Sequence, residues 1–333
     1  MFQPFKEAFA LLARTTPYLI MRLLVYTFAG VVVGIYWLVV GLFALMVGKI
    51  NSVAGIVVFI IGLAANLWLW RLLREYMLYI VKAGHIAVIA ELVSRGKLPE
   101  GEGQVAFGKR MVTERFGQAS GLFAADQLVK AIIGALNRTL FTVTAFLPFL
   151  RGLARFAQLV VDRSLTYVDE AILARTYVTG ERNIWESARQ GIILYGMNWK
   201  PILKTAVLTA LIGYFATAVI FVIFLGPALA ISALLPPGFR TVALAIAAVF
   251  AFTTRLALVE PFSMTATLVT YLRAVEGQVP DPAWEARLAS LSGKFGELKQ
   301  RAGEFARGSG AQPGPAPAFA GAGGPGPQGP KVP

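Results

Sequence analysis

One uncharged segment constrains this chain more than any other feature of its sequence. Residues 23–48 carry no charged side chain between Arg22 and Lys49. As an α-helix rising 1.5 Å per residue, this segment is long enough to cross a hydrocarbon core about 30 Å thick with some tilt. It is too long for the apolar core of a signal peptide, and no small-residue cleavage pattern follows it. The segment therefore predicts a transmembrane helix.

Composition indicates several such helices. Of the 333 residues, 56% are hydrophobic and 15% are charged, and the mean hydropathy is +0.65. A soluble domain carries about 25% charged residues. Three further apolar runs lie at residues 53–70, 205–239 and 241–271. Because short loops join the first run to the second and the third to the fourth, we expect two antiparallel hairpins, which gives four membrane spans.

The distribution of charge predicts the orientation of these spans. The chain has 31 Lys and Arg against 18 Asp and Glu, a net charge of +13, yet each short hairpin loop holds one base, Lys49 or Arg240. The positive-inside rule then places both termini and the middle segment on the cytoplasmic side of the cell (inner) membrane. We expect anionic lipid headgroups to be the partners of these bases. The bases are not clustered on one module, so we expect no nucleic-acid binding.

The reactive residue types are scarce. Cysteine is absent and His85 is the single histidine, which excludes disulfides, thiol catalysis and multi-histidine metal motifs. Residues 103–110 match the G-x-x-x-x-G-K part of a phosphate-binding loop, but Arg110 stands where that loop needs Ser or Thr. We interpret this stretch as a basic cytoplasmic loop. The sequence predicts no enzyme, no cofactor and no metal site.

The predicted fold class is all-α: a polytopic helical membrane protein built from two parallel two-span hairpin repeats plus a middle helical or re-entrant segment. Residues 5–8 and 185–188 begin similar amphipathic stretches before the first and third spans, and an even number of spans in each unit makes the repeats parallel. The expected divisions are an interfacial amphipathic helix at 1–17, the first hairpin at 18–95, the middle segment at 96–183, an interfacial helix and the second hairpin at 184–275, a cytoplasmic amphipathic helix at 276–307 and a disordered Gly/Pro/Ala tail at 308–333.

Three stretches outside the four predicted spans have their own patterns. Residues 139–150 are too short to span a bilayer and suit a re-entrant or interfacial segment, or half of an extra buried hairpin. Residues 151–176 form an amphipathic pattern whose acids we expect in solvent; these are Asp162, Asp169 and Glu170. Residues 284–305 keep a heptad spacing about three repeats long and predict one helix. Its glycines make it marginal alone, so we expect it to dock on the cytoplasmic helices of its own chain.

Polar groups at membrane depth are the candidate site. A carboxylate there costs ~2.5–3.5 kcal/mol unless it faces water or a partner. Glu260 is therefore either a cation or substrate contact, or part of a kink at Pro261 paired with Arg255. His85 is either a proton or substrate site, or a hydrogen-bonded packing histidine. The candidate substrate-binding residues are Asn66, His85, Asp126, Arg255 and Glu260.

Four stretches resemble the membrane core of the choline transporter-like family. They lie at residues 79–91, at 113–123, from 159–169 through 186–189, and at 275–278 before the polar C-terminal helix. The likeness is one of layout over residues 75–300. This chain departs from the family in being shorter, in lacking its large extracellular loop and in having no cysteines. The resemblance implies transport of choline-like or other small organic cations, and a further membrane helix at residues 120–137.

Three functions follow from these patterns. The leading interpretation is facilitated passage of a small solute through a cavity between the two hairpin repeats. A second is a non-transporting membrane scaffold or accessory subunit, whose cytoplasmic helices are the working part. A homo-oligomeric channel is the third. The G-x-x-x-G of Gly30 and Gly34, with Ala243, Ala247 and Ala251, favours close contacts between spans of one chain.

Overall fold

The structure is a computed structural model, and it describes residues 3–72, 78–116, 125, 127–135, 154–234 and 237–308. Within these ranges the chain is helical and contains no strand. Four helices are long and apolar enough to cross a membrane, namely Thr16–Ile50, Ser52–Leu69, Trp199–Ala233 and Ala243–Ala274. The prediction of an all-α chain with four such helices is confirmed.

The first apolar hairpin follows a short amphipathic helix. Helix α1 (Gln3–Arg14) leads into α2 (Thr16–Ile50), and α3 (Ser52–Leu72) packs back along α2. The turn is narrow because both helices carry glycine there: a Cβ on Gly55 would lie 2.6 Å from Gly48 Cα. Glycine thus allows the two backbones to approach more closely than any side chain would permit.

The second apolar hairpin contains a local change of helix type. Helix α9 (Trp199–Ala233) packs against α10 (Pro237–Thr254), which continues through a π-helical turn, η4 (Arg255–Val259), into α11 (Glu260–Ala274). The backbone N–H of Glu260 donates to the carbonyl of Arg255, five residues back. Pro261 has no N–H and cannot continue α-helical hydrogen bonding. The wider turn lies directly before this proline. Single π-helical turns within α-helices are frequent at functional sites.

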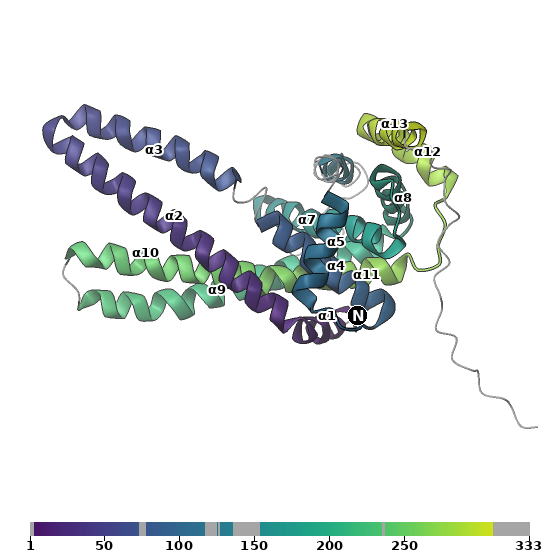
Figure 1. The fold of residues 1–333 in the computed structure, drawn as a ribbon, viewed down its shortest axis with the longest axis horizontal. Coiled ribbons are helices and arrows are strands. Elements are labelled where there is room, and N and C mark those ends of the chain that lie inside the picture. The colour runs from purple at the N-terminus through teal and green to yellow at the C-terminus, as the bar shows by residue number, and fades with distance from the viewer. Residues whose placement is uncertain are drawn as a thin grey trace, which may run out of the picture.

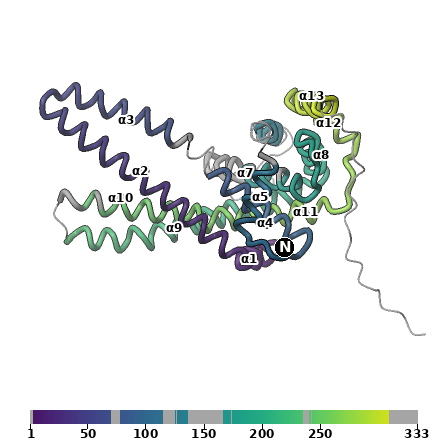
Figure 2. The backbone as a smooth tube through the Cα atoms, viewed as in Figure 1, coloured from purple at the N-terminus to yellow at the C-terminus, as the bar shows by residue number. Residues whose placement is uncertain are grey.

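The remaining helices form a packed body. These are α4 (Tyr79–Arg95), α5 (Gln104–Phe116), α7 (Ala154–Thr179), α8 (Ile184–Met197), α12 (Pro282–Leu291) and α13 (Gly293–Gly308). Figure 1 shows the two hairpins projecting from one end of this body. The backbone tube in Figure 2 places α12 and α13 at the opposite end of the molecule. The fully buried core of the body includes Ile89, Ile132, Ile172, Ile192 and Tyr271.

The hairpins meet where α2 crosses α10 and η4. A Cβ on Gly30 would lie 2.9 Å from Val249 Cγ1 and 3.2 Å from Thr253 Cγ2, whereas a Cβ on Gly34 would have no atom within 4 Å. The predicted contact between spans therefore involves Gly30 and not Gly34. Beyond this crossing, α3 diverges from α9 and α10 (Figure 1). Ala251 is fully buried, consistent with close helix approach at small residues.

Several predictions for the cytoplasmic region need correction. Residues 104–116 form helix α5 and not a basic loop. The predicted single helix at 284–305 is two helices, because Ser292 is extended (φ −149°, ψ 115°) and ends α12. Serine favours helix ends, and the following Gly293 costs about 1 kcal/mol in a helix interior. Both helices pack on α8 (Ile184–Met197), so they dock on their own chain, at the helix that was predicted to be interfacial.

Some predictions concern residues that the structure does not describe. These are residues 139–150 and Asp126 in the middle segment, and the tail from residue 309 onward. Of the stretch at 120–137, residues 127–135 are described and helical. Val129, Ile132 and Ile133 are fully buried there, in the core of the body.

Candidate functional site

Helix α4 brings together two polar clusters at the junction between hairpins and body. The carboxylate cluster contains Lys82, Lys130, Asp169, Glu170 and Glu260. The arginine–histidine cluster contains Thr15, Tyr18, Arg22, Tyr26 and His85. Lys82 and His85 lie one helical turn apart, on neighbouring positions of the α4 surface. The same helix thus joins both clusters.

In the carboxylate cluster, one ammonium lies between two acids. Lys82 Nζ is in ion-pair contact with Glu170 Oε1 and lies 3.9 Å from Glu260 Oε1. The side chains of Glu170, Glu260 and Lys82 are 6%, 12% and 20% exposed. Helices α7, α11 and α4 supply these three residues. The cluster therefore connects the base of the second hairpin to the body through charge.

Helix α7 presents acids to the interior, which corrects the expectation of a solvated face. Asp169 is fully buried, and Lys130 Nζ lies 3.4 Å from its Oδ2. Glu170 is buried beside it. The reason is packing on several sides: α7 lies against α4, α8, α9 and α11, so little of its circumference faces water. The side chain of Asp162 lies outside what the structure describes.

The surroundings of Glu170 shift its pKa in opposite directions. Burial raises the pKa of Glu170, the Lys82 ammonium lowers it, and the Glu260 carboxylate raises it again; the net direction is upward. Among the residues that the structure describes, no hydrogen-bond donor reaches the buried Oε2 of Glu170. The pKa of Lys82 lies above its usual value, because its two carboxylate neighbours outweigh burial. Lys82 is thus held as a cation between the two acids.

Glu260 has a different partner from the one predicted. The structure pairs it with Lys82 on α4 and not with Arg255, which lies half-buried at the start of η4. Arg255 and Glu260 are five residues apart, whereas helical side-chain pairs form best at a spacing of three or four residues. The interhelical contact ties η4 and α11 to α4.

The arginine–histidine cluster is closed to solvent. Arg22 Nη1 lies 3.3 Å from His85 Nδ1, and Arg22 Nη2 donates to the Tyr26 hydroxyl at 3.0 Å. His85 Nε2 lies 3.1 Å from Thr15 Oγ1, whose own hydroxyl donates to the Leu12 carbonyl. These roles assign the imidazole as neutral, with its proton on Nε2 and its Nδ1 accepting from Arg22.

The surroundings of His85 hold the ring in this form. Tyr18 stacks on the imidazole with ring centres 4.9 Å apart, and the side chains of His85 and Arg22 are both fully buried. Burial, followed by the positive charge of Arg22, keeps the pKa of His85 well below its usual value. Of the two interpretations offered for His85, this geometry matches the hydrogen-bonded packing histidine.

Asn66, another predicted site residue, does not join these clusters. Asn66 lies half-buried on α3, with its side-chain oxygen buried and without a hydrogen-bond donor. Asp126 lies outside the described residues. Of the predicted residues that the structure describes, His85 and Glu260 lie at the α4 junction. Over the part of the chain that the structure describes, no group of three or more Asp, Glu or His side chains is arranged to hold a metal ion.

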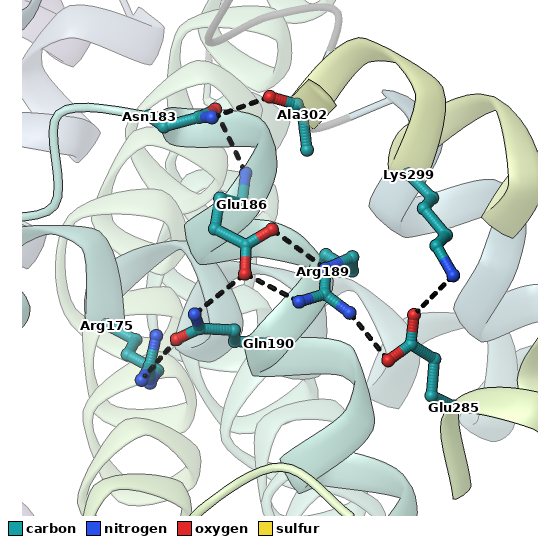
Figure 3. A network of polar contacts seen from close by, with 8 residues as sticks. All are labelled: Arg175, Asn183, Glu186, Arg189, Gln190, Glu285, Lys299 and Ala302. Atoms are coloured by element: carbon teal, nitrogen blue, oxygen red, sulfur yellow. Dashed lines mark hydrogen bonds and ion pairs between the residues drawn. The ribbon is translucent and has the colours of Figure 1, made fainter. Parts of the chain in front are cut away.

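A further polar network fastens α12 and α13 to α8 (Figure 3). Arg189 donates two hydrogen bonds to Glu186, at 2.6 and 2.8 Å, and reaches Glu285 on α12 at 2.7 Å. Lys299 on α13 lies 3.1 Å from the same Glu285 carboxylate. Partial burial raises the pKa of Glu285, but the bonds from Lys299 and Arg189 outweigh it, so the net direction is downward.

Packing accompanies this network. Asn183 caps α8 by accepting from the Glu186 N–H at 3.1 Å, and its amide donates to the Ala302 carbonyl on α13 at 2.8 Å. Trp284 covers Gly196, where a Cβ would lie 2.9 Å from the indole ring. Phe295 and Leu298 are fully buried. The C-terminal helices are therefore an integral part of the body.

Comparisons with protein-family models, with curated proteins and with solved structures found no match to this chain. The resemblance to the choline transporter-like family stays a prediction from the residues.

Proposed function

We propose that this chain is an integral protein of the inner membrane that facilitates passage of a small organic cation, bound at the carboxylate cluster. The observation that carries the proposal is the buried pair of acids, Glu170 and Glu260, sharing the one ammonium of Lys82. Glu260 lies within an apolar helix long enough to cross a membrane, and ionisable groups at membrane depth are costly and mark substrate or ion pathways. Its carboxylate would attract a choline-like cation, in line with the family resemblance. The role we propose is not enzymatic.

The order of helices in the two halves supports the proposal of two parallel repeats. Helix α1 precedes the hairpin α2–α3, and α8 precedes the hairpin α9–α10, which is the order expected of two parallel repeats. The π-turn η4 lies in the helix that carries Glu260 and touches α2 of the other half. We propose that both termini and the body are cytoplasmic, where exposed bases meet anionic headgroups; examples are Lys6, Lys109, Lys200 and Lys204.

A scaffold function has its own support. The hairpins diverge beyond Gly30, and α12 and α13 are fixed to the body by ion pairs and buried apolar residues. A membrane anchor with a rigid cytoplasmic body would be built in this way. The divergent hairpins also leave faces that a second copy would cover in a homo-oligomeric channel.

Uptake by proteoliposomes separates these functions. The purified chain is reconstituted and offered a panel of organic cations and anions. Cation uptake above that of protein-free liposomes supports transport, and Glu260→Gln should reduce it about tenfold, since losing one charge-assisted contact costs about 1.4 kcal/mol. Glu276→Gln is the matched control, because Glu276 is half-exposed on the cytoplasmic linker. Absence of uptake for every solute would contradict transport and favour the scaffold.

A further inference from the structure

Two carboxylates lie close to the single ammonium of Lys82. Its ammonium contacts Glu170 and lies within 3.9 Å of Glu260, so two carboxylates meet one cation in a largely buried site. Two like charges that share a buried site resist simultaneous ionisation, since each is poorly solvated and repels the other. In such pairs, one acid commonly takes up a proton.

Glu170 is the acid whose surroundings favour the neutral form. Its Oε1 is in ion-pair contact with Lys82, whereas no residue that the structure describes donates to its buried Oε2. The groups facing it are Lys82 from α4, Glu260 from α11, Lys130 from residues 127–135 and Asp169 from α7 itself. In the described part of the chain, α8 and α9 also pack on α7 but contribute no ion pair to Glu170. An oxygen without a donor gains little from remaining charged.

We infer that Glu170 binds a proton at neutral pH, so that the carboxylate cluster is a proton-binding site. The proton comes from bulk water and forms an O–H bond at Oε2, which lowers the negative charge of the cluster by one and breaks no other bond. Lys82 remains an ammonium, balanced by Glu260. Water reaches the edge of the cluster, because the side chain of Lys130 is 42% exposed and that of Lys82 is 20% exposed.

This inference concerns the same cluster as the proposed transport but does not depend on it. A protein without uptake activity could still hold the proton, and a transporter could hold both acids ionised. The test therefore reads the carboxylic acid directly by infrared spectroscopy, which resolves the C=O stretch of a protonated carboxyl from the bands of carboxylates. It uses the full chain in proteoliposomes, titrated with pH.

The wild-type chain should show a carboxylic-acid band at pH 7 that disappears in Glu170→Gln. Glu276→Gln, at a half-exposed position, should leave the band unchanged. A wild-type spectrum without a carboxylic-acid band at pH 7 would overturn the inference. So would a band that persists in a folded Glu170→Gln variant, or one that Glu260→Gln removes instead.

A second variant covers the case in which Glu170→Gln does not fold. Lys82→Gln removes the cation that favours the ionised acid, so the midpoint of the band should move to higher pH by about 1–3 units. Uptake measured on the same liposomes distinguishes the two proposals. Absence of the band with intact uptake contradicts the proton site alone, and presence of the band without uptake contradicts transport alone. An unchanged midpoint in Lys82→Gln would also contradict proton binding at Glu170.

Discussion

Arg22 Nη1 lies 3.3 Å from His85 Nδ1, so a hydrogen bond between two basic side chains joins the first apolar hairpin to the body. This arrangement requires a neutral imidazole, because a protonated ring would place two cations in contact without solvent. Thr15 completes the arrangement by accepting from the other ring nitrogen at 3.1 Å. Helix α2 is thereby fixed at its N-terminal end.

Acid should loosen this junction. Burial and Arg22 lower the pKa of His85 in the folded chain, whereas the unfolded chain keeps a value of about 6.5. The unfolded state therefore binds more protons below that pH, and stability should fall as the pH drops from about 6.5 toward the folded-state pKa. Thermal unfolding in detergent between pH 7 and pH 5 measures this fall.

Two substitutions at His85 sharpen the test. Glutamine offers an acceptor to Arg22 and a donor to Thr15, so His85→Gln should stay folded and lose the pH dependence. Leucine leaves the guanidinium with one acceptor fewer, and His85→Leu should cost about 2 kcal/mol. Equal stability of the leucine and wild-type chains would show that the hydrogen bond to Arg22 contributes nothing.

The crossing of the hairpins should depend on Gly30. Its Cβ position is 2.9 Å from Val249, so Gly30→Leu should separate α2 from α10 and destabilise the chain by about 1–3 kcal/mol. Gly34→Leu is the matched control, because that position is open. Unfolding in detergent gives the stabilities. A change in oligomeric mass for Gly34→Leu would instead mark this face as a contact between copies.

Membrane orientation can be tested with single cysteines, since the chain has none of its own. Lys49 and Arg240 are exposed at the tips of the hairpins, and Lys109 is exposed on the body. In intact cells, an impermeant thiol reagent should label cysteines at positions 49 and 240 and should spare one at 109. Labelling at 109 alone would reverse the orientation.

Removing α12 and α13 should destabilise the body. A chain ending at Gly277 lacks Phe295 and Leu298, which are fully buried, so its thermal stability in detergent should fall while its oligomeric mass stays the same. Loss of mass with unchanged stability would make these helices an oligomerisation device. Glu285→Gln, which removes partners from both Arg189 and Lys299, should reproduce about 1 kcal/mol of the loss.

The apolar hairpins were predictable because the thickness of the bilayer sets the length of each helix. A helix must carry about 20 apolar residues to cross the bilayer, and the runs beginning at residues 23, 53, 205 and 241 meet that requirement without reference to other parts of the chain. Glu260 was found for the same reason, as a charge within an apolar run. Its partner was wrong because only local spacing was considered.

The rest of the site depends on contacts between distant segments. Lys82 and Glu170 are 88 positions apart in sequence, and no periodicity reveals that they meet. An acidic face on an amphipathic helix normally faces water, so burial of Asp169 and Glu170 required knowledge of the helices around α7. One weak signal was present in the sequence. Lys82 directly precedes residues 83–90, which are mostly small and apolar, and a base next to such a stretch indicates a buried partner.

The π-turn at Arg255–Val259 has a consequence for how this chain tolerates length changes. A π-turn holds one residue more than an α-turn, and one residue corresponds to about 100° of rotation about the helix axis. Deleting one residue within this turn would let it become a regular α-turn, and the helices on both sides would keep their angular phase, so Glu260 would still face Lys82. A single-codon deletion should therefore be tolerated better inside this turn than elsewhere in α10 or α11, where it would rotate every side chain on one side of the deletion.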